Sequence, residues 1–114
     1  GIYENTYREK EKLWQHLKIR GPMREKSDPE IVAAILKITL GSKAIFCIES
    51  MIDWLYLAGI FKGNSYQYRI NTPGEVSGKN WSLVIPVSLD GLLRHKVNKK
   101  IKELIILSGR GIGK

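Results

Sequence analysis

The residues best suited to chemistry in this chain lie between positions 68 and 86, in the stretch YRINTPGEVSGKNWSLVIP. Arg69, Asn71 and Asn80 supply hydrogen-bond donors and acceptors held in planar groups. Trp81 adds a flat apolar face beside them. This combination suits a polyhydroxylated ligand such as a sugar.

The backbone of the same stretch is predicted to bend sharply. Pro73-Gly74 and Gly78 are residues typical of turns, so the stretch is expected to form a shaped loop between two apolar segments. An ordinary ordered loop over a buried Trp81 is the alternative. Composition alone leaves both interpretations open.

The order of these residues resembles a known family. R-I-N-x-P-G, followed after a few residues by G-x-N-W, is similar to the signature near the C-terminus of amylomaltases, the bacterial and plant 4-α-glucanotransferases. Four further segments match that family in the same order. Residues 1–5 resemble its G-W-Y-E-N run, and residues 11–14 resemble the E-K-L-W of a helix. Residues 42–48 resemble its last barrel strand, and residues 53–55 resemble its D-L-L run. The resemblance spans nearly the whole chain, but only about the last quarter of the family's domain.

The chain also departs from the family pattern. Ile52 stands where the family usually has Gln, and Leu83 and Val84 stand where it often has an aromatic residue and Arg. Each departure removes a group that could touch sugar. These departures predict fewer side-chain contacts to sugar than the family pattern has.

The resemblance implies a retaining transferase that moves α-1,4-glucan segments between maltooligosaccharides without metal or cofactor. Such enzymes use two carboxyl groups roughly 5–5.5 Å apart. All of the family's catalytic carboxylates lie upstream of the matching region, so no catalytic residue is assigned here. The implied substrate-binding residues are Asn71, Pro73, Gly74, Arg69 and Trp81. Trp81 is expected to pack beneath the loop, with sugar stacking as the alternative, and Arg69 to brace the loop through carbonyls or Asp53.

Local carboxylates offer a weaker route to catalysis. Glu49 and Asp53 are four residues apart, a spacing that one helical turn would bring to one face. A structural role for Asp53, capping or bonding the loop, is the favoured interpretation. His16 and His95 have no Ser or Cys nucleophile at motif spacing, and both are expected on the surface.

The composition limits which disulfides, metal sites and membrane-spanning segments the chain can contain. The chain has 114 residues and a single cysteine, Cys47, which excludes a disulfide within the chain and predicts an inert buried thiol. No Cys/His cluster has zinc spacing, and no apolar run approaches the ~20 residues of a membrane span. The polar N-terminus lacks a signal region, so a cytoplasmic location is expected.

The net charge of +8 raises the possibility of nucleic-acid binding. The basic cluster consists of Arg94, Lys96, Lys99, Lys100 and Lys102. Apolar residues recur among them at helical spacing, which indicates the outer face of an amphipathic helix. Aromatic residues do not interleave with the cluster, so nucleic-acid binding is disfavoured.

The predicted order is helix, helix, strand, short helix, long loop and helix. The helices are expected over 2–18, 29–40 and 92–107. Ser27 and Asp28 are both possible N-caps of the second helix, and Gly41 is its expected stop. Residues 44–48 form a continuous apolar run typical of a strand buried on both faces, and 82–87 is a weaker strand candidate.

One strand and a weaker candidate do not make a sheet, which predicts that the chain is part of something larger. With the resemblance, the expected fold is α/β: the mostly helical C-terminal segment of a (β/α)8 TIM barrel, not a complete barrel. The chain is treated as one unit, 1–114, with a frayed tail over 109–114. Its expected partners are the glucan and either the rest of the barrel or a second copy. A small non-catalytic basic module that binds glucan, nucleic acid or a protein is the alternative.

Overall fold

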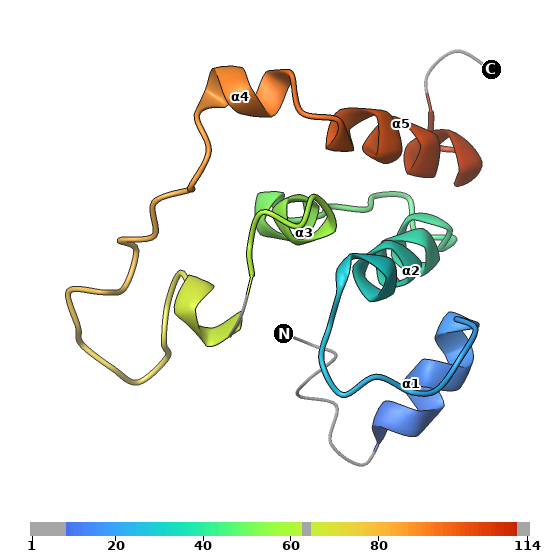
Figure 1. Cartoon of the computed structure of the whole chain (residues 1–114), viewed down its shortest axis with the longest axis horizontal. Helices are drawn as coiled ribbons and strands as arrows, with labels where there is room; N and C mark the ends of the chain where they lie inside the picture. The colour runs from blue at the N-terminus through green and yellow to red at the C-terminus, as the bar shows by residue number, and fades with distance from the viewer. Residues whose placement is uncertain (1–8, 63–64, 112–114) are drawn as a thin grey trace.

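The computed structural model describes residues 9–62 and 65–111. In chain order its elements are α1 (Lys10–Leu17), α2 (Pro29–Leu40), α3 (Met51–Leu57), the 3₁₀ helix η2 (Ser65–Tyr68), α4 (Leu89–Leu93) and α5 (Val97–Leu107), shown in Figure 1. Helix α2 packs against α1, α3 and α5 and is the centre of the structure.

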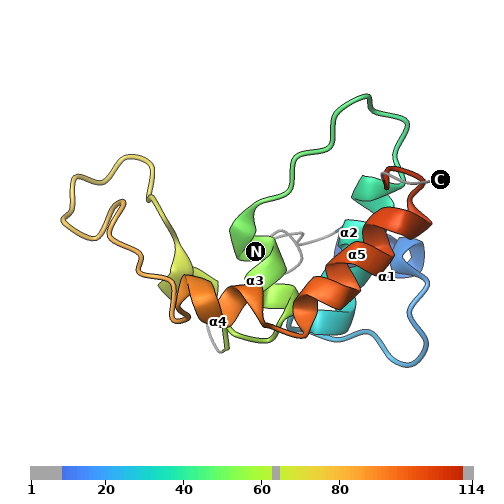
Figure 2. The ribbon, with the colours of Figure 1, turned by 90° about the horizontal axis from the view of Figure 1, so that it is seen from above.

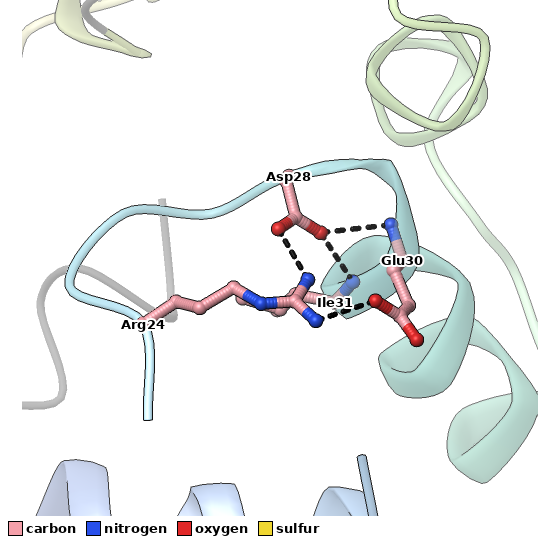
Figure 3. Close-up of polar contacts among 4 residues, drawn as sticks. All are labelled: Arg24, Asp28, Glu30 and Ile31. Carbon is pink, nitrogen blue, oxygen red and sulfur yellow. Dashed lines mark hydrogen bonds and ion pairs between the residues drawn. The ribbon is translucent and has the colours of Figure 1, made fainter. Parts of the chain in front are cut away.

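The start of α2 is fixed by one carboxylate (Figure 3). Asp28 Oδ1 accepts hydrogen bonds from the backbone N–H groups of Glu30 and Ile31, at 2.9 and 3.0 Å. Arg24 bridges the side chains of Asp28 and Glu30, at 2.5 and 2.6 Å. The predicted helix over 29–40 and its Asp28 cap are confirmed, and Pro29 occupies the first turn, where its missing N–H is harmless.

Two small apolar clusters hold the helices together. The larger cluster joins α2, α3 and α5 through Leu36, Leu40, Leu57, Val97 and Leu104. The smaller one joins α1 to α2 through Leu17 and Ile31. Burial of these side chains is the main stabilising term of the helical body.

The first predicted helix is shorter than expected. Residues 1–8 lie outside the described part of the chain, and α1 ends at Leu17 because Lys18 adopts a left-handed conformation with φ of 54°. The predicted C-terminal end at residue 18 is therefore confirmed to within one residue, and the difference lies at the start of the helix.

The predicted helix over 92–107 is divided into α4 and α5. His95 lies between them and its Nδ1 accepts a hydrogen bond from the Val97 N–H at 3.1 Å. Asn98 donates to the carbonyls of Leu92 and Leu93, at 2.8 and 3.0 Å, so the end of α4 is bonded to the start of α5. The five cationic residues of this region are exposed, as predicted for a solvated helix face.

The predicted strands over 44–48 and 82–87 do not form, and the described residues contain no strand. Ile45, Phe46 and Ile48 are exposed at 88%, 83% and 92% instead of buried on both faces. The physical reason is that a parallel strand needs neighbouring strands to pair its backbone groups. These neighbours are absent from the described part of the chain.

The structure exposes far more surface than a compact domain of its size. Its accessible surface is 8962 Å². A folded monomer of this mass would expose roughly 6300 Å². Segments 41–50 and 69–87 extend away from the packed helices (Figures 1 and 2). No helix among the described residues is long and apolar enough to cross a membrane.

Candidate functional site

The segment predicted to bind a ligand follows η2 and is anchored there by aromatic rings. Tyr68 stacks on the buried Phe61 with ring centroids 4.1 Å apart, and Tyr56 meets both rings edge-on. The Tyr68 hydroxyl donates to the Lys62 carbonyl at 3.1 Å. Since these contacts connect η2 to the end of α3, the loop begins from a fixed point.

The tip of the loop is a β-turn over residues 72–75. The Glu75 N–H donates to the Thr72 carbonyl at 3.2 Å, and Gly74 has φ of +83°. Pro at the second position of a turn and a residue with positive φ at the third are the signature of a type II turn. The bend predicted from Pro73-Gly74 is confirmed.

Three hydrogen bonds from Asn80 and Trp81, where the chain returns, close the loop, which we call the 70–81 loop. Asn80 Oδ1 accepts from the Thr72 N–H at 3.0 Å, and Asn80 Nδ2 donates to the Glu75 carbonyl at 2.8 Å. The Trp81 N–H donates to the Ile70 carbonyl at 2.6 Å. The loop is therefore a closed surface loop with its ends bonded together.

Three of the predicted binding residues lie in the turn at the tip of this loop or directly before it, and they face solvent. Asn71, Pro73 and Gly74 are all exposed. Pro73 and Gly74 are in the turn and Asn71 directly precedes it, so the Asn71 amide and the ring of Pro73 are accessible to a ligand.

Trp81 was expected to pack beneath the loop, and that interpretation is wrong in this structure. Its side chain is 78% exposed, and its backbone adopts a left-handed conformation with φ of 63°. A bulky residue in this conformation is a backbone outlier that occurs where the surrounding bonds enforce it. Here the backbone bond to Ile70 is the observed restraint.

Arg69 makes a different contact from the one predicted. Its guanidinium lies 4.4 Å above the ring of Tyr66, a cation–π geometry, and the structure gives no bond to Asp53. The contact holds Arg69 beside η2 at the base of the 70–81 loop. Arg69 and Tyr66 are both exposed.

Asp53 has the structural role that the sequence favoured. It lies in the first turn of α3 and accepts from the Ser50 N–H at 3.2 Å, while Ser50 Oγ caps the helix in return. Burial raises the pKa of Asp53, the charge of Glu49 raises it further, and the Ser50 bond opposes both. Glu49 lies before the helix, so the predicted shared helical face does not exist.

Cys47 is half-buried rather than buried, and it is held by Glu49. Its Sγ donates to Glu49 Oε1 at 3.2 Å, and the same oxygen accepts from the Thr39 hydroxyl at 2.5 Å. The bond to Glu49 raises the pKa of the Cys47 thiol, with help from burial. A thiol that keeps its proton is a poor nucleophile, in agreement with the predicted inert role.

One conspicuous contact was missed by sequence reasoning. Arg110, in the segment predicted to fray, donates to the carbonyls of Leu40, Ser42 and Ala44, at 2.6, 2.8 and 2.6 Å. It therefore fixes the chain that leaves α2. A lone Arg between glycines carries no sequence signal for this contact, because its partners lie about seventy residues earlier in the chain.

Comparison with known proteins decides the family. The sequence profile described as 4-alpha-glucanotransferase matches residues 1–88. The chain belongs to the 4-alpha-glucanotransferase family. The resemblance inferred from the R-I-N-x-P-G and G-x-N-W blocks is confirmed.

A curated 4-alpha-glucanotransferase of Chlamydia pneumoniae is 38% identical to this chain over 76 residues. The match covers 66% of this chain and 14% of that relative. The match therefore spans only a small part of that relative's own length. No solved structure matches it.

The region matched to the 4-alpha-glucanotransferase family contains α1, α2, α3, η2 and the whole 70–81 loop. Helix α4 begins at Leu89 and, with α5, falls outside the match. Within the described residues no group of His, Cys, Asp and Glu side chains is arranged to hold a metal ion.

Proposed function

We propose that this chain is part of a 4-α-glucanotransferase and supplies one loop of its glucan-binding cleft. The observation that carries the proposal is the closed 70–81 loop, which presents Asn71, Pro73 and Gly74 to solvent in a chain of this family. The parent reaction is the transfer of α-1,4-glucan segments between maltooligosaccharides. Family membership favours this function over a stand-alone basic binding module.

In this proposal the loop binds and orients glucan, and the carboxylates that break and form glycosidic bonds come from other parts of the enzyme. The Asn71 amide donates to and accepts from sugar hydroxyls. Pro73 and Gly74 shape the backbone that lies against the sugar. The exposed indole of Trp81 stacks on the apolar face of a glucose unit.

The proposal also covers the fold of the complete protein. We infer that residues 44–48 become a buried strand when the rest of a (β/α)8 barrel is present, with the 70–81 loop on the carboxyl side of that strand. The excess accessible surface and the exposed Ile45, Phe46 and Ile48 support this inference. The cytoplasmic location remains part of the proposal and is tested by fractionation of the source cells.

The test is Asn71→Ala in the complete protein, assayed by disproportionation of maltotriose. We expect kcat/KM to fall about tenfold, since a site built to bond hydroxyls loses affinity when a polar partner is removed. Asn98→Ala is the matched control because it removes an asparagine bonded only to the α4–α5 junction. Equal rates for the Asn71→Ala protein and the unchanged protein would contradict the assignment of Asn71.

A further inference from the structure

One side chain, that of Asn80, joins both ends of the turn at the tip of the 70–81 loop. Its Oδ1 accepts from the Thr72 N–H at 3.0 Å, on one side of Pro73-Gly74. Its Nδ2 donates to the Glu75 carbonyl at 2.8 Å, on the other side. The Asn80 amide thus accepts one hydrogen bond from the turn and donates one to it, as a backbone peptide group of a neighbouring strand does.

This pairing requires the amide group. Asparagine offers one acceptor and one donor in a single plane, whereas aspartate would place a second acceptor against the Glu75 carbonyl. Asn80 is also half-buried, while Asn71 is exposed. The two asparagines of the loop therefore differ in role: the side chain of Asn80 faces the loop, and Asn71 is open to a ligand.

We propose that Asn80 is a positioning residue for glucan binding, which acts by fixing the backbone that places the Asn71 amide. The proposal rests on the proposed function of the loop. Asn80 does not touch the sugar; it holds the turn so that the Asn71 amide is already placed when glucan arrives. Displacements on the order of 1 Å at a binding group are enough to lower kcat/KM strongly.

A role confined to general stability would look different. The turn has its own bond from Glu75 to Thr72, and the ends of the loop are joined by Trp81 and Ile70. Loss of Asn80 therefore loosens residues 71–75 and leaves the helical body unchanged. The effect on glucan should then pass through Asn71, whereas a general loss of stability would act independently of Asn71.

The experiment is a double-mutant cycle on the complete protein, with kcat and KM measured for maltotriose disproportionation. The variants are Asn80→Ala, Asn71→Ala and the two combined, with Asn98→Ala as the control that removes two equivalent side-chain bonds elsewhere. We expect Asn80→Ala to lower kcat/KM about tenfold, mainly by raising KM. In the Asn71→Ala background, the same change should lower kcat/KM by less than about twofold. The same factor in both backgrounds, or no effect, would overturn the proposal.

Hydrogen exchange at the Thr72 amide separates this proposal from the proposed function. Faster exchange at Thr72 in Asn80→Ala, with unchanged exchange in α2, is the expected result. Unchanged exchange at Thr72 would show that Asn80 does not hold the turn and would overturn the inference alone. If exchange at the Thr72 amide is faster in Asn80→Ala but the unchanged protein transfers no glucan, the proposed function is wrong. The proposed role of Asn80 in glucan binding is then wrong as well.

Discussion

Arg110 and Leu40 are seventy positions apart, yet Arg110 Nε donates to the Leu40 carbonyl at 2.6 Å. Leu40 is the last residue of α2, so this bond satisfies a carbonyl that has no partner within the helix. The same guanidinium also donates to the carbonyls of Ser42 and Ala44. One side chain near the end of the chain therefore fixes the path between α2 and α3.

Arg110→Ala is predicted to destabilise this path. Hydrogen bonds to a charged group contribute about 1.5–3 kcal/mol, and water can replace part of that at the exposed Ser42 and Ala44, so we expect about 1–2 kcal/mol. Urea unfolding of the chain measures the change. Arg94→Ala is the control, since Arg94 is an exposed arginine at the end of α4, away from the path between α2 and α3. Equal destabilisation by both variants would contradict the role of Arg110.

The Asp28 cap predicts a specific dependence of stability on pH. Burial favours a raised pKa, but the bond from Arg24 and those from the N–H groups of Ile31 and Glu30 outweigh it, and the pKa of Asp28 is lowered. A carboxyl whose pKa is lower in the folded state adds stability above its unfolded pKa, which is about 3.9. That stability is lost as the pH falls through the lower, folded value.

Asp28→Asn keeps a capping oxygen and removes the titrating charge. We expect it to lower the free energy of unfolding at pH 7 and to lose this difference in acid, as followed by thermal unfolding between pH 7 and pH 2. The control is Asp90→Asn, in the first turn of α4, where Ser88 is the cap. A difference between Asp28→Asn and the unchanged chain that stays constant across this pH range would refute the prediction.

Two substitutions of the exposed Trp81 separate its contribution to maltooligosaccharide affinity from the backbone strain at this residue. Trp81→Ala and Trp81→Gly both remove the indole, so we expect both to weaken maltooligosaccharide binding by about fivefold, from ~1 kcal/mol of aromatic contact. Glycine tolerates the left-handed conformation and alanine does not. The glycine variant should therefore be the more stable of the two by about 1 kcal/mol. Calorimetric titration and thermal unfolding measure the two quantities, and equal stability would exclude stored strain at this residue.

The segment 44–48 is predicted to behave oppositely in the isolated chain and in the complete enzyme. Phe46→Ser with Ile48→Ser should reduce self-association of the 114-residue chain in sedimentation, because both side chains are exposed. In the complete protein the same change should abolish folding, since emptying a buried Phe site alone typically costs about 3–5 kcal/mol. Val76→Ser, at an apolar residue on the exposed loop, is the control and should alter neither. If the complete protein with Phe46→Ser and Ile48→Ser folds normally, the inference that residues 44–48 form a buried strand is wrong.

Local signals in the sequence were sufficient for several features. The Ser-Asp-Pro-Glu run predicted the start of α2, and Pro73-Gly74 predicted the turn, because caps and turns depend on residues within four positions of one another. Helix periodicity identified the exposed lysines of α5. The ordered blocks around Asn71 and Trp81 identified the family.

Other features could not be predicted because they depend on distant parts of the chain. The run 44–48 has the composition of a buried strand, but strand formation requires partners that the described residues do not contain. Trp81 is exposed and has a left-handed backbone conformation that its residue type disfavours, with its N–H bonded to the Ile70 carbonyl eleven residues earlier. Residue type and spacing were therefore misleading at these two positions.

The sequence by itself determined the family, the α2 helix with its Asp28 cap and the Pro73-Gly74 turn, since each is encoded in short contiguous motifs. Only the tertiary structure decided that Asn80 closes the 70–81 loop, that Trp81 faces solvent and that Arg110 bonds to the end of α2. The physical reason is that each of these features requires two backbone segments to be brought together. The chain's path in space, rather than the identity of any one residue, determines which groups meet there.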